Sequence, residues 1–122
     1  ARVALERGLP VSVTRSAFSP AVAEMALTLI LALLRKTSSY HAAMRAGTEA
    51  WLQSFPDDID PLERELTGRS VGIIGFGRIG RRLRELLLPF RCEVRIADPF
   101  VSEDAAAAAG VTKADLPGLL AS

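Results

Sequence analysis

A glycine-rich turn between an apolar strand and a helix is the feature that most constrains the fold of this 122-residue chain. Residues 71–74 (VGII) predict a buried strand, and the pattern G-x-G-x-x-G follows over 75–80. The spacing then predicts a helix over 78–88, closed by Pro89, and a second strand over 94–98. A strand, a helix and a strand within about 30 residues form a βαβ unit, whose strands pair in parallel through a right-handed crossover.

Each glycine of the turn has a physical reason to be there. Gly75 permits the tight turn out of the strand, Gly77 lets a pyrophosphate approach the backbone, and Gly80 lets the helix pack close to the strand. The backbone N–H groups of Arg78, Ile79 and Gly80 then face the phosphates at the positive end of the helix dipole. We therefore expect dinucleotide binding here, and a glycine-rich turn without function is the weaker alternative.

Asp98 supports this expectation, because it ends the second predicted strand 18 residues after Gly80. A carboxylate at this place accepts hydrogen bonds from the adenosine ribose and repels a 2′-phosphate. The sequence thus predicts NAD in preference to NADP. It also predicts an α/β fold, a Rossmann-type doubly wound parallel sheet that is incomplete in this chain.

Composition excludes several other classes of protein. The net charge of +1 argues against a nucleic-acid binder, and the single cysteine excludes an intramolecular disulfide and a cysteine-built zinc site. We find no leader sequence and no apolar run of the roughly 20 residues that a membrane span needs, so we expect a soluble, cytoplasmic protein. We also expect no metal site. The chain begins at Ala1 without an initiator Met, and we expect it to be a piece of a longer protein.

The first half of the chain predicts mainly helices. The predicted elements are a helix over 2–7, a short strand over 11–14, a helix over 21–36, a more polar helical continuation over 37–50 and a surface loop over 53–65. The helix over 21–36 is apolar on nearly every face, so we expect it to be buried all round. An ordinary core helix is the simpler interpretation, and a surface that meets another subunit or the missing part of the chain is the alternative. A further short helix is expected over 105–109.

Other chemically active side chains are interpreted as structural. His41 is expected on the surface, Trp51 as a packing anchor and Cys92 as a small core residue. The arginines of the helix over 78–88 other than Arg78 are expected on a solvated face, where Arg81 and Arg82 are each at pairing distance from Glu85, and help with phosphate binding is the alternative. No residue of this chain is therefore assigned a catalytic role.

Four stretches of the chain resemble the D-isomer-specific 2-hydroxyacid dehydrogenases: 6–11 (ERGLPV), the helix that begins AVAE at 21, 66–80 (LTGRSVGIIGFGRIG) and 97–100 (ADPF). The resemblance implies that residues 1–14 are the end of a substrate domain and its hinge. Residues 15–122 are then the N-terminal portion of an NAD-binding domain. The AVAE helix favours this family over other NAD enzymes with the same turn, such as adenosylhomocysteinase or alanine dehydrogenase.

The resemblance also implies roles for single residues. Arg78 and Ile79 would hold the pyrophosphate through their backbones, Asp98 the adenosine ribose, Pro99 would line the adenine side, and Thr14 would touch the cofactor near the hinge. The family's catalytic Arg, Glu and His would follow residue 122, so we expect the 122 residues alone to be inactive. The parent protein is then expected to be a homodimeric enzyme that transfers hydride between NAD and a D-2-hydroxy or 2-oxo acid. A corepressor-like module of the same family, which binds NAD without catalysis, is the alternative.

Overall fold

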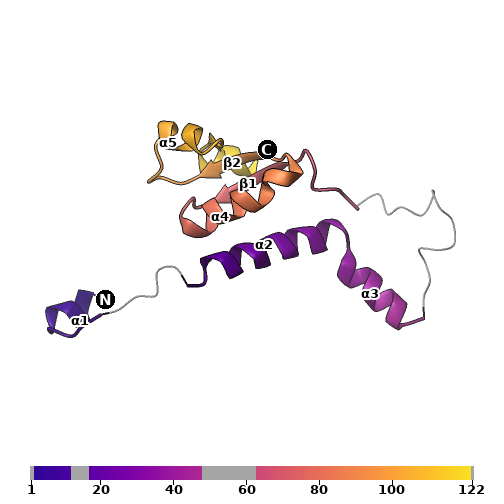
Figure 1. Cartoon of the computed structure of the whole chain (residues 1–122), viewed down its shortest axis with the longest axis horizontal. Coiled ribbons are helices and arrows are strands. Elements are labelled where there is room, and N and C mark those ends of the chain that lie inside the picture. The colour runs from indigo at the N-terminus through magenta and orange to yellow at the C-terminus, as the bar shows by residue number, and fades with distance from the viewer. Residues whose placement is uncertain (1, 12–16, 48–62, 122) are drawn as a thin grey trace.

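A three-stranded parallel sheet organises the C-terminal half of the computed structural model, which describes residues 2–11, 17–47 and 63–121 (Figure 1). The strands are β1 (Ser70–Ile74), β2 (Glu93–Ala97) and β3 (Thr112–Lys113), in the order β1-β2-β3. The helices are α1 (Arg2–Glu6), α2 (Ser19–Leu34), α3 (Thr37–Arg45), α4 (Arg78–Leu87), α5 (Glu103–Ala108) and α6 (Leu116–Leu120), with a 3-10 turn η2 at Leu88–Phe90.

The βαβ unit predicted from the glycine turn is confirmed. Strands β1 and β2 pair in parallel, with Val71 opposite Val94 and Ile74 opposite Ala97, and α4 is the connection between them. The observed bounds differ from the predicted ones by one residue at most, so that Asp98 is the first residue after β2. This placement puts Asp98 at the carboxyl edge of the sheet, beside the turn that follows β1.

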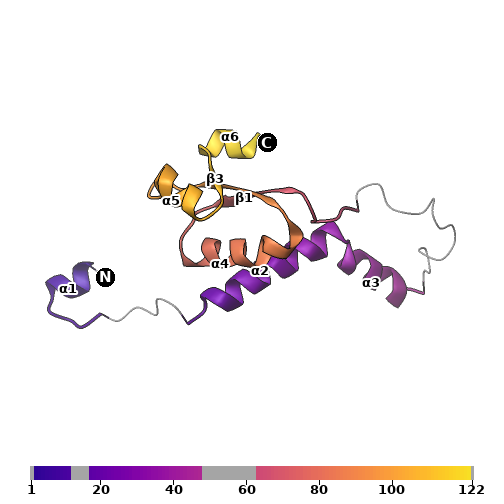
Figure 2. The same cartoon turned by 45° about the horizontal axis from the view of Figure 1, so that its top comes forward.

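Helices cover both faces of the sheet, as a doubly wound fold requires. Alternate residues of a strand point to opposite faces. On one face, a Cβ built on Gly72 would lie 3.1 Å from Leu119 Cγ of α6. On the other face, a Cβ built on Gly80 of α4 would lie 3.2 Å from Ile73 Cγ2. Figure 2 shows the same arrangement, with α6 on one side of the sheet and α4 and α2 on the other.

The hydrophobic core lies mainly between the sheet and α4. Phe76, Leu87 and Ile96 are its largest fully buried side chains, and Ala23 of α2 is fully buried beside them. Each large apolar side chain buried in this way stabilises the fold by about 1.5–3 kcal/mol. The core therefore fixes α4, and with it the glycine turn, against the strands.

The prediction that the apolar helix over 21–36 is buried all round is wrong for the described chain. In α2 only Ala23 is buried, although the helix packs along α4. Five large apolar side chains on or beside α2 are exposed and recur at helical spacing, and we call them the α2 stripe: Phe18, Val22, Met25, Leu29 and Leu33. A helix that packs along one neighbouring helix buries only the face that meets it. The apolar composition of α2 therefore does not show what covers its other faces.

The predicted helical continuation is confirmed as far as Arg45, but it is a separate helix. Lys36 has φ 49°, a left-handed conformation that interrupts the backbone between α2 and α3. Residues 48–50 lie outside the described part of the chain. The chain therefore turns at Lys36, where the sequence predicted no break.

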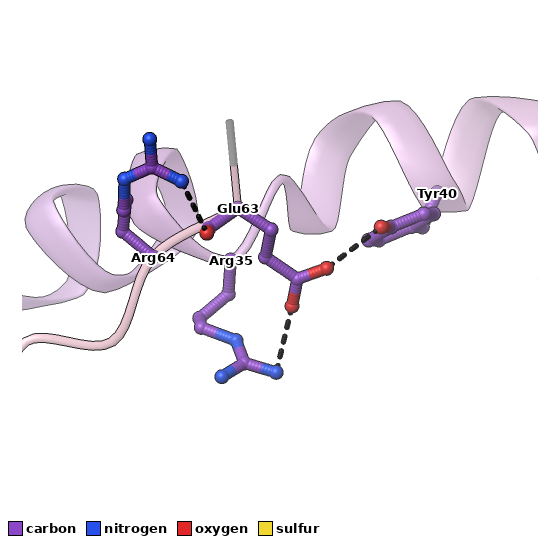
Figure 3. A network of polar contacts seen from close by, with 4 residues as sticks. All are labelled: Arg35, Tyr40, Glu63 and Arg64. Carbon is purple, nitrogen blue, oxygen red and sulfur yellow. Dashed lines mark hydrogen bonds and ion pairs between the residues drawn. The ribbon is translucent and has the colours of Figure 1, made fainter. Parts of the chain in front are cut away.

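A segment distant in the sequence holds this turn (Figure 3). The Glu63 carboxylate accepts a hydrogen bond of 2.8 Å from the Tyr40 hydroxyl and forms an ion pair of 2.7 Å with Arg35. The backbone N–H of Arg64 donates to the Leu34 carbonyl at 2.9 Å, which satisfies one of the last carbonyls of α2. The end of α2 is thus tied to the chain that leads into β1.

Other predicted elements have mixed outcomes. The helix over 2–7 is confirmed as α1, and the helix at 105–109 as α5, which begins two residues earlier. The predicted strand over 11–14 lies outside the described residues except for Val11, which is not in a strand. The predicted loop over 53–65 also lies outside them, except for 63–65, which have no regular structure. Neither β3 nor α6 was predicted.

Candidate dinucleotide-binding site

The first and second glycines of the turn shape the backbone between β1 and α4. Gly75 has φ 87°, a conformation that favours glycine, and its N–H donates to the Ala97 carbonyl at 2.9 Å. Gly77 is the N-cap of α4 and brings no side chain to cap the helix. The first helical hydrogen bond runs from the Arg81 N–H to the Gly77 carbonyl at 3.0 Å. The positive end of the α4 dipole therefore lies at this turn, an arrangement that suits an anion.

The third glycine permits a close contact. A Cβ built on Gly80 would clash with the backbone carbonyl oxygen of Gly75, and it would also press on Ile73. Gly80 is buried, and at this residue α4 lies close to Ile73 of β1. The approach of the helix to the strand thus depends on the absence of a side chain.

An open cavity of about 610 Å³ lies at this turn. It is lined by Ser19, Ile73, Ile74, Gly75, Gly77, Arg78, Ile79, Gly80 and Leu83. Five of the predicted site residues therefore share one cavity. Ser19, which the sequence analysis missed, brings a hydroxyl to it from the first turn of α2; no pattern in the sequence relates Ser19 to the glycine turn.

The position of this cavity distinguishes it from a second one. A cavity of about 630 Å³ is lined by residues of the range 63–70, which lead into the amino end of β1. In open α/β sheets, ligands bind beyond the carboxyl ends of the strands. The cavity at the glycine turn has that position and the other does not.

Asp98 is tied to the same turn by its hydrogen bonds. Its Oδ2 accepts from the Phe76 N–H at 2.7 Å, and its Oδ1 accepts from the Phe100 N–H at 2.8 Å. Both hydrogen bonds lower the pKa of Asp98, and the bond from the Phe76 N–H has the larger effect. The positive charges of Lys113 and Arg81 also lower this pKa. The side chain is therefore an anion at neutral pH and retains lone pairs for a hydroxyl donor.

Pro99 and Thr14 are the two remaining predicted site residues. Pro99 is exposed and directly follows Asp98 at the edge of the sheet. Thr14 lies outside the described residues. Neither Asp98 nor Pro99 lines the cavity, and Asp98 is connected to it through its hydrogen bond from the Phe76 N–H.

Of the side chains interpreted as structural, His41 is exposed on α3 as predicted, and Trp51 lies outside the described residues. Cys92 is half-buried with Sγ 3.3 Å from the Leu66 carbonyl oxygen, and burial raises the pKa of its thiol, which disfavours the nucleophilic thiolate.

The arginines of α4 make different contacts: Arg81 is exposed as predicted, Arg78 is also exposed, and Arg82 and Arg84 are half-buried. Arg82 pairs with Glu85 at 2.8 Å, as their spacing predicts. Arg81 instead lies with its guanidinium carbon 4.7 Å from the centroid of the Phe76 ring. This contact is a cation–π interaction across the first turn of α4, and helical spacing alone could not reveal it.

The described ranges 2–11, 17–47 and 63–121 hold neither a candidate metal cluster nor a candidate membrane-spanning helix. They contain no group of three or more His, Cys, Asp or Glu side chains arranged to hold a metal ion. They also contain no helix long and apolar enough to cross a membrane.

The site fits NAD on two observations. A Cβ built on Gly77 would meet no atom within 4 Å, so the space above the turn that a pyrophosphate needs is open. The ionised carboxylate of Asp98, bound to the same turn, offers acceptors for the ribose hydroxyls. The residues present therefore fit the pyrophosphate and the ribose of an adenosine diphosphate moiety.

Comparison with known proteins agrees with this geometry. Residues 27–122 match the model of the D-isomer specific 2-hydroxyacid dehydrogenase NAD binding domain. The chain is 40% identical over 85 residues to D-lactate/D-glycerate dehydrogenase of Pediococcus acidilactici, covering 69% of this chain and 24% of that protein. It is 35% identical over 91 residues to 2-ketogluconate reductase of Gluconobacter oxydans, covering 75% of this chain and 27% of that protein.

A solved structure gives the same result. A phosphoglycerate oxidoreductase from Rhizobium etli matches with a TM-score of 0.80 and 33% identity, over 97% of this chain and 38% of that one. The chain thus spans 24% and 27% of the lengths of the two curated relatives above. On this evidence the chain belongs to the D-isomer specific 2-hydroxyacid dehydrogenase family, as part of its NAD-binding domain.

Proposed function

We propose that the intact protein containing this chain transfers hydride between NAD and a D-2-hydroxy acid or its 2-oxo acid. One observation carries the proposal: the cavity at the N-terminus of α4 is joined to the Asp98 carboxylate through the Phe76 N–H. The family membership supports the reaction class. No observation among the described residues favours the corepressor-like alternative, so it is not carried further.

In this proposal the chain's own residues bind and orient the cofactor. The backbone N–H groups of Arg78 and Ile79 hold the pyrophosphate at the positive end of α4. Asp98 accepts from the adenosine ribose, Pro99 lines the adenine side and Thr14 contacts the cofactor near the hinge. Bound NAD supplies the hydride acceptor or donor at its nicotinamide ring.

The proposal assigns the rest of the reaction to other parts of the protein. Residues 1–14 are the end of a substrate domain and its hinge, and 15–122 are the N-terminal portion of the NAD-binding domain. Acid–base catalysis needs groups within hydrogen-bond reach of the reacting hydroxyl. These lie outside the 122 residues, which alone are inactive. The single cysteine fits a reducing compartment, which supports a cytoplasmic location.

Asp98→Asn tests the ribose contact. The intact protein is expected to reduce a 2-oxo acid with NADH, and Asp98→Asn is expected to weaken NADH binding about tenfold, because hydrogen bonds to a charged acceptor contribute about 1.5–3 kcal/mol. Asp104→Asn, an exposed carboxylate in the first turn of α5, is the matched control and should leave the Kd unchanged. Equal NADH affinity of wild type and Asp98→Asn would remove Asp98 from the site.

We also propose that the protein is a homodimer in which the α2 stripe is covered by a second copy. The stripe occupies one side of α2, Ala23 and the partly buried side chains of α2 pack against the core on another side, and Glu24 and Thr28 lie on a third, polar side. An exposed apolar surface of this kind is typical of a protein interface. A homodimer therefore explains why α2 is apolar on the side that α4 does not reach.

Leu29→Glu tests the dimer, because a charge buried in an apolar interface is costly. Leu29 is 55% exposed in the single chain, so the fold of the monomer tolerates the change. Sedimentation of the intact protein is expected to shift from dimer to monomer at micromolar concentration, and Thr28→Glu on the polar side should leave the dimer intact. A wild-type monomer, or a Leu29→Glu dimer, would contradict the proposal.

A further inference from the structure

The turn between β1 and α4 carries a single side chain, the ring of Phe76. Its neighbours Gly75 and Gly77 have none, and glycine leaves the backbone more conformational freedom than other residues do. Neighbouring side chains therefore do not restrict the direction of the Phe76 N–H. Apart from the backbone bond of Gly75 to the Ala97 carbonyl, this direction depends on how the ring is held.

The Phe76 N–H orients the carboxylate that we propose for the ribose. It donates to Asp98 Oδ2 at 2.7 Å, while the Phe100 N–H donates to Oδ1 at 2.8 Å. Phe100 lies only two residues after Asp98, so the bond from Phe76 is the one that ties the carboxylate to the glycine turn. A shift of the Phe76 backbone would change the direction in which this carboxylate meets a ribose hydroxyl.

Arg81 holds this turn in two ways. Its guanidinium carbon lies 4.7 Å from the centroid of the Phe76 ring, and its backbone N–H donates to the Gly77 carbonyl at 3.0 Å. Phe76 is only 2% exposed and belongs to the core, whereas Arg81 is exposed on α4. The guanidinium therefore covers the ring where the core reaches the surface of the molecule.

This partner of Arg81 is not the one that helical spacing offers. Glu85 lies four residues after Arg81, which is a typical distance for an ion pair on a helix. The Glu85 carboxylate instead pairs with Arg82 at 2.8 Å. Among the residues that the structure describes, Arg81 forms no ion pair, so no carboxylate draws its guanidinium away from the ring.

We propose that Arg81 is a positioning residue for the cofactor: it holds the ring of Phe76, and through the Phe76 N–H it fixes the Asp98 carboxylate that receives the adenosine ribose. The inference rests on the proposed function, which places the ribose at Asp98. Arg81 itself needs no contact with the cofactor. Its effect on binding therefore exists only for a ligand whose adenosine ribose offers hydroxyl groups to Asp98.

Calorimetric titration of the intact protein with two ligands at neutral pH tests this role. One ligand is NADH, and the other is an NADH analogue whose adenosine carries 2′,3′-dideoxyribose, which has no hydroxyl group for Asp98. Arg81→Gln is expected to weaken NADH binding about threefold, the size of effect that the loss of one exposed cation–π contact gives. Binding of the analogue is expected to stay unchanged.

Arg82→Gln is the matched control for this experiment. It makes the same substitution at the next residue of α4 and removes an ion pair that does not reach the glycine turn. Both Kd values should stay those of the wild type. Arg81 is exposed and glutamine is a good helix former, so Arg81→Gln is expected to fold like the wild type, which circular dichroism checks.

The outcomes separate this inference from the proposed function. Equal weakening of both ligands in Arg81→Gln would mean that Arg81 acts through its charge or on the turn as a whole, and the positioning role would be wrong. An unchanged affinity for NADH would also overturn it, and in either case NADH binding by the wild type leaves the proposed function standing. If the wild type binds NADH and the analogue equally well, the ribose contact of Asp98 fails and this inference fails with it. If the wild type binds neither ligand, the proposed function itself is wrong.

Discussion

Gly80→Ala in the intact protein is expected to lower the free energy of unfolding by about 3 kcal/mol. A methyl group at this position would clash with the Gly75 carbonyl oxygen and press against Ile73 Cγ2 at 3.2 Å. The Gly75 carbonyl oxygen belongs to the backbone and cannot rotate away as a side chain would, so α4 must move away from β1. Alanine in a helix normally stabilises by about 0.5–1 kcal/mol over glycine, which is too little to offset this overlap.

Urea unfolding followed by circular dichroism measures this effect, because a lower midpoint at unchanged slope reports a loss of stability. NADH binding is expected to fall in parallel, since the N-terminus of α4 is displaced together with the cavity at the turn. A variant as stable as the wild type would show that α4 does not approach β1 as closely as the structure has it. The matched control is the same substitution three residues earlier, at Gly77.

Gly77→Ala is expected to weaken NADH binding about 100-fold while leaving stability within about 0.5 kcal/mol of the wild type. Its φ of −76° suits alanine, and a Cβ there would meet no protein atom within 4 Å. The space is open in the protein alone, but it is the space that a pyrophosphate needs in order to reach the N–H groups of α4. The methyl group therefore competes with the cofactor and not with the fold.

The two alanine variants together distinguish a loss of stability from a loss of NADH binding. Calorimetric titration with NADH gives the Kd of each, and the urea midpoint gives its stability. Gly80→Ala should lose stability and binding together, whereas Gly77→Ala should lose binding alone. NADH affinity within twofold of the wild type in Gly77→Ala would mean that the pyrophosphate does not lie over this turn.

The βαβ unit could be predicted because its signals are local. The apolar run 71–74, the glycine spacing and Pro89 each restrict the backbone within a few residues, and together they allow one arrangement. The predicted placement of Asp98 beside the turn follows from parallel pairing alone, since residues after neighbouring parallel strands meet at one edge. Most of the candidate site could therefore be predicted from the sequence alone.

The elements that were missed have weak or distant signals. β3 has two residues, too few for an alternating pattern, and it forms because it pairs with β2. α6 does carry a start signal, since Asp115 caps it by accepting from the Gly118 N–H at 2.8 Å and Pro117 lies in its first turn. Five residues are short for a periodicity, and the helix is positioned by the contact of Leu119 with the sheet.

The sequence by itself determined the glycine turn, the parallel pairing that it opens and the carboxylate that ends the second strand. Tertiary structure alone decided the break at Lys36, the exposed α2 stripe, and the positions of Ser19 and Arg81 at the site. The physical reason is the range of the interactions. Backbone sterics and hydrogen-bond patterns act between neighbours in the chain, whereas burial, ion pairing and cation–π contact depend on which distant surfaces meet.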